Sequence, residues 1–186
     1  MCLLTPVLLA ILFQFPVSGQ TPVEHPKPNP KFKDYATGEV FRGRAAKIVW
    51  PSDVDPHDPN LQKMREAVQD TIPRKPNFAG HYAIVEYSCG TECSQITVVD
   101  LKNGLVLMAV PYDTLDLDAD PKVGIPYPGL SYKRNSRLLV ASGCFDWDSP
   151  ESKRECGTKY FELKDDGFAL LKYVPGPMPM RLKPQK

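Results

Sequence analysis

The segment from Gly80 to Ser88 carries two side chains of the kind that transfer protons, His81 and Glu86. Its β-branched and aromatic residues predict a strand. Side chains alternate along a strand, and positions 81 and 86 are an odd number apart, so these two side chains point to opposite faces and form no dyad. We expect His81 to be a hydrogen-bonded core residue on the face of Ala83. Glu86 is expected either in water at a sheet edge or as a paired buried acid.

Four cysteines follow the first nineteen residues: Cys89, Cys93, Cys144 and Cys156. An even number of cysteines in an oxidising compartment favours disulfides. The repeat described below favours pairing the first with the second and the third with the fourth, although pairings between the halves would close longer loops and stabilise more. The spacings differ from those of a zinc double knuckle, and a redox centre would need Cys-x-x-Cys at a helix start. The prediction is two structural disulfides.

A run of alternating acids begins like a calcium-binding loop, with Asp116, Asp118 and Asp120 in Asp-x-Asp-x-Asp spacing. The sixth position of such a loop must be glycine and the twelfth is glutamate, whereas this chain has Pro121 and Tyr127 there. The sequence therefore excludes an EF-hand and leaves open a looser calcium site. A solvated acidic loop without metal is the expected structure, and no cofactor is predicted.

Two aromatic residues, Phe145 and Trp147, lie between Cys144 and Cys156, where a connection between strands is normally polar. Aromatic anchors on a closed loop are typical of interaction hot spots, so we predict a binding site at this loop. The alternative is that Trp147 folds back over the sheet and caps the core. The sequence contains no Gly-x-Ser-x-Gly, phosphate-binding loop, dinucleotide fingerprint or His-Glu-x-x-His.

The first nineteen residues contain no charged side chain and are apolar from Leu3 to Phe15, a pattern typical of a secretory signal peptide. The apolar block is too short to span a bilayer, so no transmembrane segment is expected after its removal. Lys and Arg total 23 against 22 for Asp and Glu, giving a net charge of +1. A nucleic-acid-binding protein usually has a basic balance, so no such partner is predicted. The expected location is periplasmic or secreted.

The proline pattern predicts the domain boundaries. After the signal at 1–19, residues 20–42 are expected to be a proline-rich linker, 43–175 a single disulfide-stapled domain and 176–186 a basic, proline-containing tail. One helix is predicted, with Asp58 as N-cap, Pro59 as its first residue and Pro73 as its terminator. Its apolar stripe consists of Leu61, Met64, Val68 and Ile72.

The remaining elements are strands, and they form two similar halves. Gly104 lies eleven residues after Cys93, and Gly167 lies eleven residues after Cys156. Each half reads as strand, Cys, loop, Cys, strand, Gly turn, strand. The predicted fold is mainly β in the α+β class, with two pseudo-repeated antiparallel β-meanders packed together and one flanking helix. The alternative is that hairpins of similar length arose without common origin. The expected strands cover residues 44–50, 80–88, 95–101, 105–110, 129–132, 137–143, 158–164 and 168–174.

The run Asn77-Phe78-Ala79-Gly80-His81-Tyr82, followed by Cys89-Gly90-Thr91-Glu92-Cys93, resembles an uncharacterised family of small exported bacterial proteins. The resemblance implies a cell-envelope location and assigns no catalytic or binding residue. We therefore expect a non-enzymatic binding or inhibitor-like module whose partner is a protein or glycan of the envelope. The alternative is a hydrolase or metal-assisted enzyme that uses His81 with carboxylates from the other half of the domain.

Overall fold

The computed structural model describes residues 28–52, 55, 57–90, 93–107, 110–112, 115–116, 129–145, 155–165 and 167–176. Among these residues, no helix is long and apolar enough to cross a membrane. The helices are a 3-10 turn, η1 (Phe32–Tyr35), and α1 (Pro59–Thr71). The strands are β1 (Tyr82–Gly90), β2 (Cys93–Asp100), β3 (Val106–Leu107), β4 (Leu115–Asp116), β5 (Gly129–Tyr132), β6 (Leu138–Phe145), β7 (Glu155–Lys164) and β8 (Gly167–Pro175).

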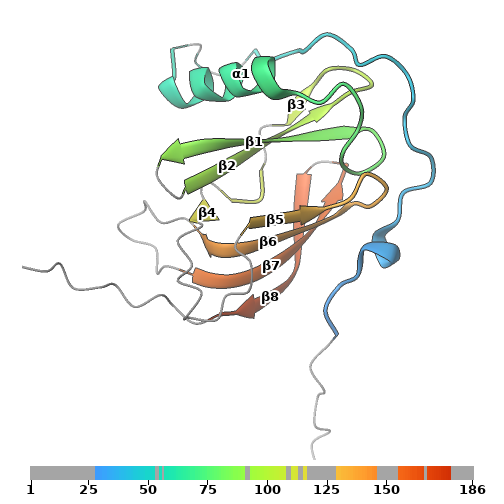
Figure 1. Ribbon diagram of the computed structural model, residues 1–186, viewed down its shortest axis with the longest axis vertical. Coiled ribbons are helices and arrows are strands. Elements are labelled where there is room, and N and C mark those ends of the chain that lie inside the picture. The colour runs from blue at the N-terminus through green and yellow to red at the C-terminus, as the bar shows by residue number, and fades with distance from the viewer. Residues whose placement is uncertain are drawn as a thin grey trace, which may run out of the picture.

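The strands form two antiparallel sheets, as Figure 1 shows. In the first sheet, β2 lies between β1 and β3. The second sheet contains β5, β6, β7 and β8 in this order. The two-residue strand β4 pairs with the start of β2 and with the end of β6, so it connects the sheets at one corner. The predicted class, mainly β with one helix, is confirmed.

Two cores separate three layers. The larger core lies between the sheets and includes Ile84, Ile96, Leu139 and Phe161. The smaller core lies between α1 and the first sheet, where Val68 packs against strand residues. The alternation of strand side chains explains the division, since neighbouring residues of β1 face different cores. The helix therefore covers only the outer face of the first sheet (Figure 1).

The helix prediction is confirmed, and one strand prediction is wrong. Leu61 and Val68 of the predicted stripe are 2% and 0% exposed, and the helix ends before Pro73. Residues 44–50, expected as a strand, form an extended segment with a single bridge, from Val49 to Leu105. Its side chains do not alternate strictly, because Ala45 and Ile48 both pack against the smaller core, and too few of its backbone groups find partners in the neighbouring turn for a ladder to form.

Each half of the sheet structure contains one disulfide-closed hairpin. Cys89 pairs with Cys93 at the end of the β1–β2 hairpin, with a Cα separation of 5.2 Å. Cys144 and Cys156 face each other across β6 and β7, with a Cα separation of 4.0 Å. The predicted pairing is thus confirmed. The order of elements is also the same in both halves, since β3 follows β2 and β8 follows β7 through turns that contain Gly104 and Gly167.

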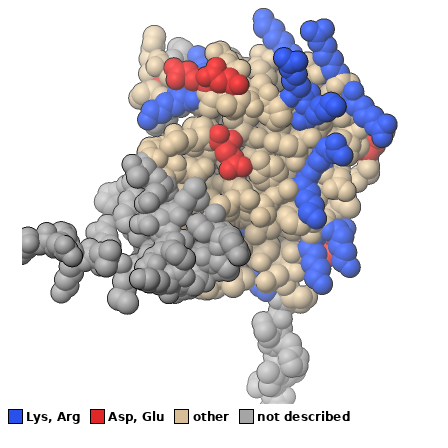
Figure 2. Space-filling model, viewed as in Figure 1, with Lys and Arg blue, Asp and Glu red and all other residues tan. Residues whose placement is uncertain are grey.

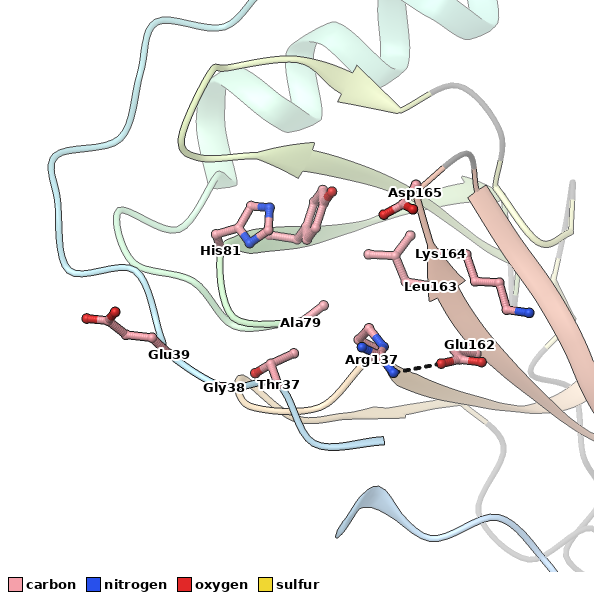
Figure 3. Close-up of a pocket in the computed structure, with 11 residues that line it drawn as sticks. Thr37, Gly38, Glu39, Ala79, His81, Arg137, Glu162, Leu163, Lys164 and Asp165 are labelled. Atoms are coloured by element: carbon pink, nitrogen blue, oxygen red, sulfur yellow. Dashed lines mark hydrogen bonds and ion pairs between the residues drawn. The ribbon is translucent and has the colours of Figure 1, made fainter. Parts of the chain in front are cut away.

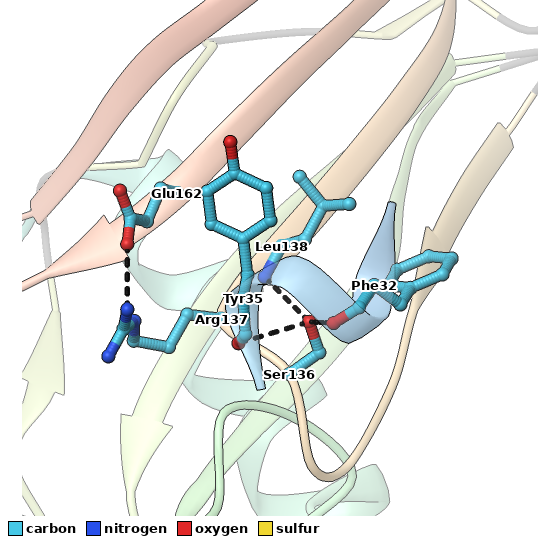
Figure 4. Close-up of polar contacts among 6 residues, drawn as sticks. All are labelled: Phe32, Tyr35, Ser136, Arg137, Leu138 and Glu162. Carbon is cyan, nitrogen blue, oxygen red and sulfur yellow. Dashed lines mark hydrogen bonds and ion pairs between the residues drawn. The ribbon is translucent and has the colours of Figure 1, made fainter. Parts of the chain in front are cut away.

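Part of the expected linker belongs to the folded unit. Figure 4 shows Ser136, which is 1% exposed, beneath η1. Its hydroxyl donates to the Phe32 carbonyl at 2.9 Å and lies 3.3 Å from the Tyr35 carbonyl, while Arg137 N donates to the Tyr35 carbonyl at 2.9 Å. Buried polar groups need such partners, so they hold the segment in place despite its prolines. The linker boundary predicted at residue 42 is therefore wrong.

Candidate functional site

The candidate site lies around a tight turn that immediately precedes β1. Ala79 and Gly80 both have left-handed backbone angles, with φ of 43° and 83°. Gly80 N donates to the Arg134 carbonyl at 2.7 Å, and Phe41 N donates to the Gly80 carbonyl at 2.8 Å. The turn thus connects the N-terminal segment to the loop between β5 and β6, and it fixes the positions of the residues on either side.

The run from Asn77 to Tyr82 has a structural explanation at each position. The Asn77 side chain hydrogen-bonds the backbone of Ile84 on the edge strand β1. Phe78 is fully buried between the sheets, where its ring stacks on Phe168 with centroids 6.1 Å apart. His81 and Tyr82 follow the turn and are both part-buried, with their ring centroids 4.2 Å apart. The turn therefore presents two adjacent rings on a rigid base.

These two rings line a pocket of about 510 Å³ at one end of the sandwich, which we call the His81 pocket (Figure 3). Its wall comes from the N-terminal segment, the turn before β1, the start of β6 and the end of β7. The lining residues are Thr37, Gly38, Glu39, Ala79, His81, Tyr82, Arg137, Glu162, Leu163, Lys164 and Asp165.

His81 is a pocket residue and not the core residue that the strand alternation predicted. It precedes the first residue of β1, and its side chain is 26% exposed. Its Nε2 lies 3.8 Å from Oδ2 of Asp100, whose Oδ1 accepts a hydrogen bond from Lys102 N. Burial lowers the pKa of His81 below its usual 6.5, although the Asp100 charge opposes this effect. The neutral imidazole can both accept and donate a proton or a hydrogen bond.

The floor of the His81 pocket contains an ion pair between strands β6 and β7. Arg137 Nη2 lies 2.9 Å from Oε1 of Glu162, and the Glu162 side chain is only 15% exposed. Glu39 and Asp165 add carboxylates at the rim, and Lys164 adds a cation. The pocket therefore offers hydrogen-bond acceptors and donors of both charges beside two rings. Among the described residues, no group of three His, Cys, Asp or Glu side chains is arranged to hold a metal ion.

A second hollow adjoins the first and has a different character. It has a volume of about 1040 Å³ and shares Thr37, Gly38 and Glu39 with the His81 pocket. Its five cationic residues are Arg42, Arg74, Lys75, Lys133 and Arg134. Glu39 is its one acidic residue among those described. We call this hollow the basic groove.

The positive charge of the basic groove is largely uncompensated. Within the part of the chain that the structure describes, no carboxylate forms an ion pair with Arg42, Arg74, Lys75 or Arg134. Lys133 lies over the Phe32 ring at 5.0 Å. Figure 2 shows Lys and Arg side chains gathered along the side where Figure 1 places the N-terminal segment and the loop before β1. The positive charges along this concave wall add to a single positive electrostatic potential, which attracts anions.

The other residues predicted for the site lie elsewhere. Glu86 is exposed on β1, facing the second sheet, and accepts a hydrogen bond from the Tyr132 hydroxyl at 3.0 Å. This contact and burial raise the pKa of Tyr132 to about 12. Glu86 does not line the His81 pocket.

The prediction that Phe145 is an exposed binding anchor is wrong. The residue ends β6, is 1% exposed and packs edge-on against Tyr112 in the larger core. Pairing of β6 with β7 continues to Phe145 and Glu155, so Phe145 belongs to the sheet and not to the loop. Trp147 lies outside the described residues.

Of the calcium candidates, the structure describes the backbone of Asp116. Asp116 belongs to β4, where its backbone pairs with Cys93 and Cys144. Asp118 and Asp120 lie outside the described residues.

Sequence reasoning did not predict the basic groove. Its cations come from three separate segments, around residues 42, 74 and 134, and none of these segments is itself a basic cluster. The one available signal was the Ala-Gly pair of the turn, because a glycine before a strand often marks a close approach of two backbones.

Comparison with family models, with curated proteins and with solved structures found no significant match to this chain.

Proposed function

We propose that this chain is an exported, non-enzymatic binding module of the cell envelope, and that its ligand contacts the His81 pocket and the basic groove together. Export is supported by the uncharged, apolar first nineteen residues and by the two disulfides, which persist in oxidising compartments. The observation that carries the binding proposal is the shared wall of Thr37, Gly38 and Glu39, which makes the two hollows neighbours that one extended ligand could reach.

The surface has the properties of a preformed site. The Ala79-Gly80 turn, its hydrogen bonds to residues 41 and 134, and the buried Ser136 fix the three segments that line it. A fixed surface loses little conformational entropy when a ligand binds. Four of its cations, Arg42, Arg74, Lys75 and Arg134, form no ion pair in the described structure, so their charges are available to a ligand.

The test is capture from an envelope extract by the immobilised domain, comparing three forms of the protein. The groove variant carries Arg42→Glu with Arg74→Glu. The control variant carries Lys47→Glu with Lys63→Glu, which changes the net charge equally at exposed positions outside the groove. We expect the groove variant to lose the captured ligand and the control to retain it. Equal capture by all three forms would remove the proposal.

One observation favours a second candidate function, proton-transfer catalysis at His81. The imidazole is open to the His81 pocket and lies near Asp100. Its lowered pKa favours the neutral form, which can act as a base. The test is hydrolysis of a panel of nitrophenyl esters, glycosides and phosphates by the wild type and by His81→Gln. Turnover that disappears in His81→Gln would establish this candidate, and its absence in the wild type would reject it.

A further inference from the structure

We propose that the ligand of this surface is an acidic polysaccharide, whose charged units lie in the basic groove and whose neutral, hydroxyl-rich part enters the His81 pocket. This inference rests on the proposed binding function and adds the chemical class of the ligand. It is drawn from the different chemistry of the two connected hollows.

The basic groove requires an anion. Four of its cations have no ion-pair partner in the described structure, and three of the five are arginines. The guanidinium group binds carboxylate and phosphate oxygens through two parallel hydrogen bonds. Asn135 adds an uncharged amide to the lining of the groove, and an amide can hydrogen-bond hydroxyl groups.

The form of the anion is constrained by charge and shape. The whole chain has a net charge of only +1, whereas a nucleic acid carries a charge at every nucleotide and is bound by strongly basic domains. Single-stranded nucleic acid also needs exposed aromatic rings for stacking, and the groove's Phe41 packs against the smaller core. A concave groove does not match a flat lipid surface. These features favour a flexible polymer with widely spaced charges.

The His81 pocket provides what a sugar ring binds. Glu39, Glu162 and Asp165 can accept hydrogen bonds from hydroxyl groups, and Arg137 can donate them. The ring of His81, which lies against the Tyr82 ring and is 26% exposed, offers the pocket a ring face of the kind against which the C–H side of a pyranose packs. The pocket contains three carboxylates and two permanently charged cations, Arg137 and Lys164. It therefore suits an uncharged sugar unit better than an anionic one.

Gly38 lies on the wall between the two hollows and is the point where a polymer would cross. A Cβ atom built at Gly38 meets no atom within 4 Å, and the residue does not have a left-handed backbone. A side chain can therefore begin there without backbone strain and without a clash at Cβ. Gly38→Trp should obstruct the crossing and leave both hollows intact, and Gly38→Ala serves as the matched control.

The experiment measures binding of half-methyl-esterified polygalacturonate, which contains both charged and neutral sugar units, by calorimetry to the full mature chain. The comparison ligands are the fully methyl-esterified polymer, digalacturonate, poly-glutamate, a single-stranded oligonucleotide and vesicles containing an anionic lipid. We expect the half-esterified polymer to bind about tenfold or more tightly than the fully esterified polymer and than poly-glutamate, with affinity that falls as salt rises. Arg42→Glu with Arg74→Glu should reduce this affinity by about tenfold or more, and Lys47→Glu with Lys63→Glu should change it by less than about twofold.

Ligands of different length test whether the polymer crosses from one hollow to the other. Gly38→Trp should weaken binding of the long polymer while leaving that of digalacturonate unchanged, and Gly38→Ala should alter neither. Unchanged binding of the long polymer to Gly38→Trp would overturn the continuous path. Circular dichroism and the melting temperature verify that each variant is folded.

The outcomes separate the ligand class from the binding function. Equal or tighter binding of poly-glutamate, the oligonucleotide or the vesicles would overturn the polysaccharide and identify another class of macromolecule. Failure of every polymer, with groove-dependent capture from the envelope extract, would overturn the ligand class while the proposed function remained. If no polymer binds and capture from the envelope extract does not depend on the groove, the ligand class and the proposed binding function are both overturned.

Discussion

The side-chain amide of Asn77 forms two hydrogen bonds with the backbone of Ile84, much as a residue of a neighbouring strand would. Its Oδ1 accepts from Ile84 N at 2.8 Å, and its Nδ2 donates to the Ile84 carbonyl at 2.9 Å. Strand β1 pairs with β2 on one side, so Asn77 covers part of its other edge. An uncovered edge leaves backbone groups unpaired and favours aggregation.

Replacing Asn77 with Ala should therefore destabilise the domain by about 1–3 kcal/mol, because both groups of Ile84 lose their partner in a part-buried position. The measurement is the free energy of unfolding in urea. Asn103→Ala is the matched control, since Asn103 accepts one exposed hydrogen bond, from Leu105 N. An equal loss in the two variants would contradict the role given to Asn77.

The two disulfides should contribute unequally to stability. The ring closed by Cys144 and Cys156 contains about 13 residues and is worth about 3 kcal/mol by loop entropy, against about 2 kcal/mol for the ring of about 5 residues at Cys89 and Cys93. Cys144 and Cys156 are also buried, at 1% and 2% exposed, so removal of their disulfide disturbs the packing around it.

The prediction is a lower melting temperature for Cys144→Ser with Cys156→Ser than for Cys89→Ser with Cys93→Ser. Differential scanning calorimetry of the two double variants measures this order. The reverse order would mean that the hairpin of β6 and β7 is held mainly by its ladder and core contacts.

The parts of the fold that local patterns determine were predictable. The stripe containing Leu61 and Val68 defines a helix because it fixes which face is buried, and the prolines on either side set its ends. The cysteine pairing followed from the repeated spacing of Gly104 and Gly167 after a cysteine. Both inferences depend on residues close together in sequence.

The site was not predictable in the same way, because segments far apart in the chain build it. His81 faces a pocket because the left-handed turn at Ala79 and Gly80 delays the start of the strand to Tyr82, two residues later than its composition suggests. Strand alternation therefore does not determine its environment. The basic groove depends on Arg42 and Arg134 approaching each other in space, and no local pattern encodes that approach.

The pKa of His81 gives the domain a dependence on pH with a definite sign. Burial lowers this pKa in the folded state below the usual 6.5, so the unfolded chain binds more protons as the pH falls. The contribution of His81 to stability is complete above pH 6.5 and is lost as the pH falls through the folded-state pKa. Asp100 and Lys102 are the charged groups acting on the ring, with opposite effects.

The free energy of unfolding of the wild type should therefore fall more steeply below pH 6.5 than that of His81→Gln. Urea unfolding at a series of pH values tests the difference in slope. His57→Gln is the control, because His57 is exposed. Parallel curves for the wild type and His81→Gln would show that the imidazole is solvated as fully in the folded state as in the unfolded state.

The last prediction concerns the two glycines of the site, which differ in what they tolerate. Gly80 has a left-handed backbone, and a Cβ atom there would lie 3.1 Å from the Glu39 carbonyl oxygen. Gly80→Ala should cost at least about 1–2 kcal/mol of stability, because an L-residue is strained in this conformation and the contact is with backbone. Gly38→Ala should change stability by less than about 0.5 kcal/mol, since the added methyl group is exposed and meets nothing. Unfolding in urea measures both. If Gly80→Ala is as stable as Gly38→Ala, the turn is not the rigid base of the His81 pocket, and the preformed character of the binding surface would have to be abandoned.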